Sequence, residues 1–346
     1  GDRTMGIYEQ PSPAFLDRLG AAFDFQPPRK HGYDTIAAIE AMHDGRAKVF
    51  FAMGGNFAAA TPDTARVVEA LRRCELTVHV STNVIRSHLV HGRQALILPC
   101  LGRTEIDLQA AGPQAVTVED SMSMVHLSSG MNPPASGQLL SEPAIVARLA
   151  TATLPRSRTP WMQLVEHYDG IRDRIAQVID GFDDFNARVR VPGGFHLHHP
   201  GRECVFPTAS GKAHFFPHAL GSAAKPNDLF QLMTVRSHDQ YNTTVYGLDD
   251  RYRGVHGVRK VCFISAHDLQ RLGWNDGDTV DIVSVWHDGE RSVHGFRLVE
   301  YDIPHGCLAA YFPETNALVP LDHHAERART PASKSIPVRL ARTAAA

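Results

Sequence analysis

Helical and strand patterns alternate along the first 150 residues of the chain. Ile36, Ile39 and Met42 recur at helical spacing, and they predict a helix that Asp34 caps and Gly45 ends. Three short apolar segments have the length and composition of strands, namely 49–53 (VFFAM), 76–82 (LTVHVST) and 94–99 (QALILP). This order of helices and strands predicts a Rossmann-like parallel sheet.

The segment 49–53 is apolar throughout, so we expect a central strand that is covered on both faces. Gly54 and Gly55 end it, and Thr61 followed by Pro62 predicts the start of a helix. A strand, a glycine turn and a helix N-terminus bring backbone amides to one point, which is where nucleotides bind in open α/β sheets. A tight turn without a ligand remains the alternative, because no GxGxxG or GxxxxGK[ST] motif occurs.

All three predicted strands end in polar or turn residues, at 54–56, 81–83 and 99–103. Ligands of open α/β sheets bind outside the carboxyl ends of the strands. We therefore expect these three loops to share one crevice.

Residues 151–193 are helical in pattern, with Leu164, Tyr168, Ile171 and Ile175 along one stripe, and we expect these helices to pack on the sheet. The segment 206–216 (FPTASGKAHFF) has the pattern of a short hairpin, and 221–228 (GSAAKPND) that of a linker.

After Leu229 the chain is rich in strands. One short helix is expected among them, because Ser265 and Asp268 form a capping-box pattern and Gly273 can end the helix. The strand segments are 229–235 (LFQLMTV), 260–265 (KVCFIS), 278–286 (DTVDIVSVW), 292–299 (SVHGFRLV) and 307–312 (CLAAYF). Several strands in so short a stretch predict a closed β-barrel.

The composition narrows the possible partners. With 43% hydrophobic and 21% charged residues in 346, the chain is long enough for two ordinary cores and is not disordered. A net charge of −2 argues against nucleic acid as a partner, and no apolar run is long enough to insert in a membrane. The chain opens GDRTMGIYEQ, unlike a natural N-terminus, so the lack of a secretory signal carries no information.

The cysteines and histidines offer few metal or catalytic motifs. Cysteines stand at 74, 100, 204, 262 and 307 without a CxxC pair, which argues against an iron–sulfur cluster or zinc ribbon here and suits reduced thiols in a cytoplasm. The runs 196–199 (HLHH) and 322–324 (DHH) either coordinate a metal or lie in solvent. Hydrolysis by Cys100 or Ser210 is a weak hypothesis, because no GxSxG elbow is present.

Several motifs follow one another in an order that resembles the C-terminal half of formate-dehydrogenase-like catalytic (alpha) subunits of the molybdopterin oxidoreductase (dimethyl sulfoxide reductase) family. They are GDRTMG (1–6), FAMGGN (51–56), VHVSTN (78–83), ALILP (95–99), FPTASGKAHFF (206–216), LMTVRSHDQYNT (232–243), NALVP (316–320) and SKS (333–335). The resemblance covers essentially the whole chain.

The resemblance implies a Rossmann-like domain over residues 1–225 and a cofactor-binding, double-psi-type β-barrel over 226–346. It implies bis-molybdopterin guanine dinucleotide, with molybdenum or tungsten, as the cofactor of the full-length protein. An iron–sulfur cluster would belong only to N-terminal domains of the same polypeptide, which are the expected partners. An electron-transfer partner is left open.

In the first half, the resemblance brings Gly54, Gly55 and Asn56 close to the nucleotide. Ser81 and Thr82 would face it from the neighbouring strand end. The family usually has an acid on the guanine edge where this chain has Thr82. That departure puts strict guanine recognition in doubt, or moves it to Asn56 or to Asn83.

In the barrel, the resemblance assigns cofactor contacts to Arg236, Ser237, His238, Tyr241 and Asn242. Arg236 is the strongest candidate, because a guanidinium offers a planar fork of donors that suits phosphate oxygens. The alternative for it is a surface arginine with a carboxylate partner. Asn316 and Lys334 are further candidates, and each could instead stabilise a loop.

No catalytic residue and no metal ligand of the family falls within this chain. The leading hypothesis is therefore the cofactor-binding part of an oxidoreductase whose parent activity is formate oxidation or a related two-electron reaction, and the chain alone is expected to be inactive. The alternative is a non-catalytic nucleotide-binding or assembly module built on the same two domains.

Overall fold

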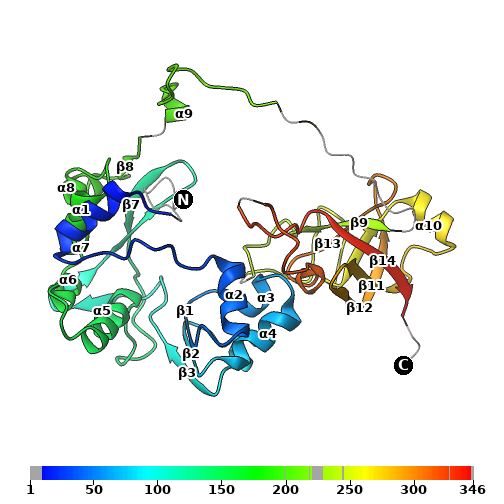
Figure 1. Cartoon of the computed structure of the whole chain (residues 1–346), viewed down its shortest axis with the longest axis horizontal. Coiled ribbons are helices and arrows are strands. Elements are labelled where there is room, and N and C mark those ends of the chain that lie inside the picture. Colours follow the sequence, from blue (N-terminus) through cyan, green and yellow to red (C-terminus); the bar gives the residue numbers. More distant parts are fainter. Residues whose placement is uncertain are drawn as a thin grey trace. The chain divides into compact units, whose positions relative to one another are not determined.

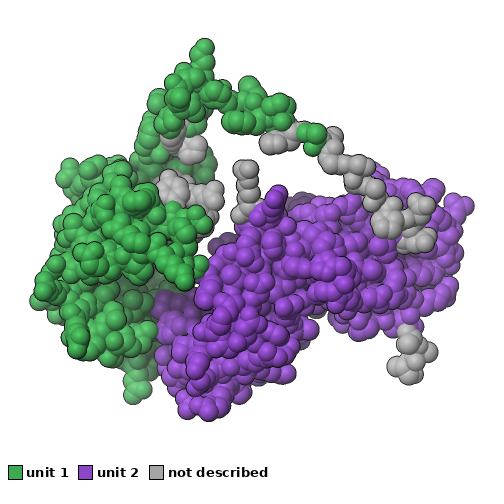
Figure 2. Space-filling model, viewed as in Figure 1, with its two compact units in different colours: residues 1–32, 99–219 green, residues 33–98, 220–346 purple. Residues whose placement is uncertain are grey.

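The computed structural model describes residues 10–198, 200–217, 219, 229–243, 245–326 and 328–343. The chain forms two compact units (Figure 2), one of residues 1–32 and 99–219 and the other of residues 33–98 and 220–346. The motif at 1–6 and the predicted linker at 221–228 lie outside the described residues.

The second unit contains a closed six-stranded barrel (Figure 1), in the order β10-β12-β11-β14-β9-β13. Its strands are β9 (Phe230–Val235), β10 (Val261–Ile264), β11 (Thr279–Trp286), β12 (Gly289–Glu300), β13 (Cys307–Tyr311) and β14 (Ile336–Arg342). Pairs β10–β12 and β9–β13 are parallel, and the other four are antiparallel. Closure pairs the edges of all six strands and surrounds an apolar core that includes Leu232, Ile282, Phe296 and Leu298.

The five strands predicted after Leu229 and the closed barrel are confirmed. The predicted helix is α10 (Ala266–Leu272), where the Ser265 hydroxyl accepts the Asp268 N–H at 3.1 Å and Gly273 ends the helix in the left-handed region. Strand β14 was missed, because an apolar period broken by Pro337 gives little strand signal.

The same unit contains a three-stranded sheet in the order β1-β2-β3, built from β1 (Val49–Met53), β2 (Leu76–Ser81) and β3 (Gln94–Pro99). Strands β1 and β2 are parallel. Helices α2 (Thr35–His43), α3 (Phe57–Ala60) and α4 (Thr64–Arg73) share a core with Leu321 from the barrel half. Asp34 caps α2 as predicted, accepting the Ala37 N–H at 2.8 Å.

Two details of this sheet differ from the prediction. Strand β1 is an edge strand with Val49 59% exposed, and β2 is the central, buried one. A run of apolar residues indicates a strand but does not say which neighbours it pairs with. Thr61 does not start a helix, because its hydroxyl donates to the Phe57 carbonyl and ends α3; Asp63 precedes α4.

The first unit holds small antiparallel sheets and short helices; the helical pattern of 151–193 is confirmed by α6 and α7, whereas the sequence patterns did not predict the sheets. Sheet β6-β7-β8 comprises β6 (Val116–Glu119), β7 (Met124–Ser128) and β8 (Phe195–His196), and β4 (Asp107–Gln109) pairs with β5 (Gly112–Gln114). The helices are α1 (Pro13–Phe23), α5 (Glu142–Thr153), α6 (Trp161–Glu166), α7 (Asp169–Val178), α8 (Phe185–Val189) and α9 (Pro200–Glu203).

The helical stripe predicted within 151–193 breaks at His167 into α6 and α7. Helix α7 packs with the antiparallel sheet, and not with the parallel sheet as expected: Ile171 and Val116 pack against one cluster, and Ile175 packs against the cluster that contains Val125. Of the stripe residues Tyr168 is buried and Leu164, Ile171 and Ile175 are half-buried, so the stripe marked the packed side of the helices but not the sheet that they cover.

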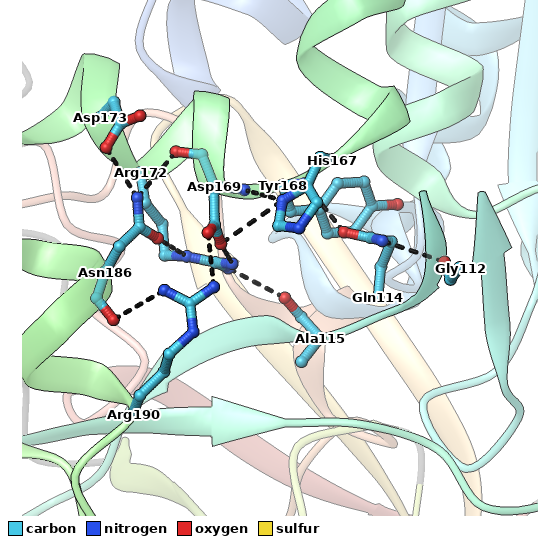
Figure 3. Close-up of polar contacts among 10 residues, drawn as sticks. All are labelled: Gly112, Gln114, Ala115, His167, Tyr168, Asp169, Arg172, Asp173, Asn186 and Arg190. Atoms are coloured by element: carbon cyan, nitrogen blue, oxygen red, sulfur yellow. Dashed lines mark hydrogen bonds and ion pairs between the residues drawn. The ribbon is translucent and has the colours of Figure 1, made fainter. Parts of the chain in front are cut away.

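A polar network joins α7 to α8 in this unit (Figure 3). The Asp169 carboxylate lies between the guanidinium groups of Arg172 and Arg190, and Arg172 also donates to the Ala115 carbonyl and to Asn186. Burial alone would raise the pKa of Asp169, but the hydrogen bonds from the two arginines hold that pKa below its ordinary value. The network therefore stabilises the fold of this unit through a paired, buried charge.

The hairpin predicted at 206–216 is not formed, because no strand occurs over residues 204–217. A turn is present instead, with the Thr208 hydroxyl donating to the Lys212 carbonyl at 2.8 Å. Phe215 and Phe216 are 98% and 76% exposed, so these aromatic residues are not covered by a sheet.

Candidate functional site

The first strand-end loop has the backbone shape that the glycines suggested. Gly54 and Gly55 have φ angles of 67° and 73°, in the left-handed region that disfavours side chains with a Cβ. A Cβ placed on either glycine would meet nothing within 4 Å, so the space beside the loop is open. The Gly54 N–H donates to the Val80 carbonyl at 2.8 Å, which ties this loop to the end of β2.

The polar residues of the two loops have different surroundings. The Asn56 side-chain oxygen accepts a hydrogen bond from the Ser87 hydroxyl, so this amide also stabilises the local fold. The Ser81 hydroxyl donates to the Asn83 carbonyl at 2.8 Å and shapes the turn after β2. Thr82 and Asn83 are exposed. The third predicted loop, 99–103, belongs to the other unit, so a crevice shared by all three loops stays a prediction.

Arg236 follows β9 and is exposed, with its guanidinium 6.0 Å from the centre of the Phe312 ring. Lys334 is close by, and its ammonium donates to the Thr234 carbonyl. Burial and then the positive charge of Arg236 lower the pKa of Lys334. Among the described residues no carboxylate forms an ion pair with either cation. Two neighbouring cations without a counter-charge make a place where an anion is stabilised.

The residues after Arg236 hold the loop together. Ser237 is 5% exposed and its hydroxyl accepts from Arg259 at 3.1 Å. His238 bonds through Nδ1 to Asp250 Oδ1 at 3.0 Å, and its ring lies tilted against that of Tyr252 with ring centres 4.4 Å apart.

Two further candidates in this loop have different backbone roles. Tyr241 is 69% exposed and forms an isolated bridge with Val245. Asn242 has a φ of 47°, and its carbonyl accepts from Gln240 at 2.7 Å. Asparagine tolerates this left-handed backbone better than most residues, so Asn242 shapes the turn.

Arg259, which the sequence did not single out, anchors the loop from beneath. It is 6% exposed and makes a two-pronged ion pair with Glu314, at 2.6 and 3.1 Å. It also donates to the Gln240 side chain at 3.0 Å and to the Phe312 carbonyl at 2.9 Å. No local motif marks this arginine, since its partners lie about 20 and 55 residues away.

A second anchor is Asp250, which is 2% exposed. Its carboxylate accepts from Tyr311 at 2.9 Å and from Arg253 at 2.6 Å, in addition to His238. Burial alone would raise the pKa of Asp250, but these hydrogen bonds hold it below the ordinary value. Together Arg259 and Asp250 fix the segment 236–242 on the barrel.

Asn316 lies in the single-turn helix η2 (Asn316–Leu318) and is 4% exposed. Its side-chain amide donates to the Ala59 carbonyl at 2.8 Å, and its own carbonyl accepts the Asp63 N–H at 3.2 Å. Asn316 thus joins the barrel to the helices that follow the glycine loop, which is the loop-stabilising alternative considered for it.

Within the described parts of the chain, the other candidates from the sequence do not gather into a three-ligand metal cluster. Cys74, Cys100 and Cys262 are buried, and burial raises the pKa of each thiol, that of Cys262 to about 12. The Ser210 hydroxyl lies 2.6 Å from His214 Nε2, but both residues are exposed. The described histidines of 196–199 and 322–324 do not gather into a three-ligand cluster. No helix among the described residues is long and apolar enough to cross a membrane.

Comparison with known proteins identifies the barrel. Residues 230–337 match the molydopterin dinucleotide binding domain. The chain is 55% identical over 351 residues to an uncharacterized oxidoreductase of Mycobacterium tuberculosis, an alignment that includes 99% of this chain and 45% of that protein. It is 47% identical to protein YdeP of Escherichia coli, over 98% of this chain and 46% of that protein.

The chain thus spans about half the length of the curated relatives it matches. The acetylene hydratase of Pelobacter acetylenicus shares the fold, with a TM-score of 0.55 and 13% identity over 95% of this chain and 50% of that one. The residues that match the dinucleotide-binding domain, 230–337, include nearly all of the closed barrel. The six-stranded barrel is therefore a molydopterin dinucleotide-binding domain, and the chain as a whole is similar to an oxidoreductase of about twice its length.

Proposed function

We propose that this chain binds the nucleotide and phosphate portion of molybdopterin guanine dinucleotide for an oxidoreductase whose parent activity is formate oxidation or a related two-electron reaction. The observation that carries the proposal is the pair of neighbouring cations, Arg236 and Lys334, without a carboxylate partner among the described residues. They stand on the matched domain, at the end of β9.

The residues present fit such a cofactor. A diphosphate needs cationic donors and a backbone that allows close approach, and the loop after β9 and the open space beside Gly54 and Gly55 provide these two features. In this proposal Arg236 and Lys334 hold phosphate oxygens. The glycine loop, with Ser81 and Thr82, approaches the nucleotide in a Rossmann-like domain.

The cofactor would supply the metal and the redox-active pterins when bound. This chain would supply positioning: charge for the phosphates, and a loop held rigid by Arg259 and Asp250. The barrel would be of the double-psi type, and the domain boundary near residue 225 stays a prediction. The expected partners are N-terminal domains of the same polypeptide, and a cytoplasmic location also stays a prediction.

The glycine loop gives a direct test, with guanosine diphosphate as the probe. Gly55→Asn and Gly55→Val each add a side chain to the open space, so both should weaken binding in a calorimetric titration. Asparagine tolerates positive φ, whereas a β-branched valine should also lose about 1–2 kcal/mol of stability. If Gly55→Asn binds as tightly as wild type while valine lowers only the unfolding temperature, the loop is a tight turn without a ligand.

A second expected result concerns turnover. The purified chain should contain little molybdenum or tungsten by elemental analysis, and it should not reduce an artificial dye with formate. The reason is that the cofactor must be enclosed from both sides, and the proposed site residues provide only one side. Stoichiometric molybdenum together with formate-dependent dye reduction by this chain would contradict the assignment.

A further inference from the structure

A cluster of two histidines and an aspartate lies on the barrel away from the proposed cofactor loops. His267 and Asp268 belong to α10, and His305 lies in the loop before β13. One ligand atom from each of the three side chains lies within 4.8 Å of the other two. The rings of His267 and His305 meet edge to face, with centres 4.4 Å apart.

Asp268 is a buried, fully bonded carboxylate at the base of this cluster. It is 0% exposed, and its Oδ2 accepts from the Ser265 hydroxyl and the Gly306 N–H, both at 2.8 Å. Its Oδ1 lies 2.7 Å from Nδ1 of His305. Burial would raise the pKa of Asp268, but the hydrogen bonds, that from Gly306 foremost, hold it below the ordinary value. The group is therefore charged at neutral pH.

This contact sets the state of the His305 ring. A carboxylate can only accept, so the proton of His305 lies on Nδ1 and its Nε2 carries the lone pair when the ring is neutral. None of the described residues bonds Nε2 of His305 or the ring nitrogens of His267, and both residues are exposed. A carboxylate behind a histidine that points its other nitrogen outward is the usual outer shell of a metal-binding imidazole.

We propose that His267 and His305 bind a divalent cation of the zinc, nickel or copper type, with Asp268 orienting His305 from behind. Imidazole nitrogens suit these cations, whereas Mg²⁺ and Ca²⁺ require oxygen ligands. The remaining positions would be filled by water.

The positive charge of Arg271 is expected to weaken cation binding at this cluster. Its guanidinium nitrogens lie 3.3 Å from Asp268 Oδ1, so a positive charge already neutralises the carboxylate. Removing Arg271 should thus raise the affinity for the cation, whereas removing either histidine should lower it. Nonspecific binding by exposed histidines would not show these opposite effects.

The cluster is distinct from the proposed cofactor site. Strands β9 and β13 are parallel, with Cys307 opposite Gln231 and Tyr311 opposite Val235. His305 precedes the start of β13, while Arg236 follows the end of β9, so the strand length of about 13–16 Å lies between them. A cation held here would clamp α10 to the loop before β13.

The test is a titration of the untagged, chelator-treated chain with Zn²⁺ alone, repeated with Co²⁺ to record the absorption spectrum. The variants His267→Ala and His305→Ala should each lose the site, and Asp268→Asn should weaken it about 10- to 100-fold. Arg271→Gln should bind more tightly than wild type.

His294→Ala is the matched control, because His294 also bonds an aspartate through Nδ1, at 2.8 Å from Asp281, but is not part of the three-ligand cluster. It should bind Zn²⁺ as wild type does. Thermal unfolding of each metal-free variant checks folding, and the two exposed histidine variants remain informative if Asp268→Asn unfolds. Unchanged affinity in both His267→Ala and His305→Ala, absence of Zn²⁺ binding to wild type, or equal binding of Mg²⁺ would overturn the proposal.

Discussion

Replacing Arg259 by alanine is expected to lower the stability of the barrel by about 3–5 kcal/mol, because one partner of a buried ion pair is removed and the other remains. Glu314 would keep a carboxylate whose side chain is only 18% exposed and would lose both bonds to the guanidinium. The aromatic rings of Tyr246 and Tyr311, whose centres lie 4.3 and 5.0 Å from the guanidinium carbon, would also lose their contact.

Hydrogen exchange measured by mass spectrometry suits this prediction, because it reports the free energy of opening segment by segment. Peptides from β9 and β13 should exchange faster in Arg259→Ala, while peptides from α7 in the other unit serve as the internal reference. The double variant Arg259→Met with Glu314→Leu removes both charges and should be less destabilised than the single one. Equal protection of β9 in the wild type and Arg259→Ala would show that the ion pair does not stabilise the barrel.

Replacing Arg236 by alanine is expected to weaken binding of guanosine diphosphate about ten- to a hundredfold and to leave the unfolding temperature unchanged. A charge-assisted contact to phosphate contributes about 1.5–3 kcal/mol, which corresponds to that range of affinities. Stability should not change because Arg236 is exposed and its guanidinium has no carboxylate partner among the described residues. Arg236→Lys keeps the charge and loses the planar fork, so an intermediate loss is expected.

Arg339→Ala is the control for this titration. Arg339 is also an exposed arginine of the barrel, but it is paired with Glu290 at 2.7 Å. Its replacement should leave the affinity unchanged. Binding by Arg236→Ala within twofold of wild type would remove Arg236 from the phosphate site. The contrast with Arg259 separates two roles, since one arginine should change affinity alone and the other should change stability first.

The barrel shows which features of the fold local sequence patterns predict. Short strand-like apolar segments predicted β9 to β13 at nearly their observed bounds, because each strand contributes buried side chains to the barrel. The start and end of α10 followed from Ser265, Asp268 and Gly273, since a helix cap is made by residues only a few positions apart. The backbone of Gly54 and Gly55 was equally local, as a positive φ favours glycine.

Pairing and packing partners were decided over longer distances. The apolar segment 49–53 became an edge strand, and the helical stripe of α7 covered an antiparallel sheet that the sequence had not indicated. The segment 206–216 had the pattern of a short hairpin but forms no strand. In each case the residues indicated what could be buried, while the neighbour came from another part of the chain.

Some residues of the proposed site could be named from the sequence, and others only from the tertiary structure. Arg236 could be named as a candidate phosphate ligand, and Lys334 as a further candidate for cofactor contact, from the resemblance of their motifs. Only the tertiary structure shows that Arg236 and Lys334 lie close together, because β14, which follows Lys334, pairs with β9, which precedes Arg236. It also shows that neither cation has an acidic partner among the described residues. The anchors Arg259 and Asp250 were not predictable, since each is defined by partners about 10 to 60 residues away. Short-range sequence dictates backbone conformation and the type of chemistry, but the pairing of charges depends on which distant segments the fold brings together.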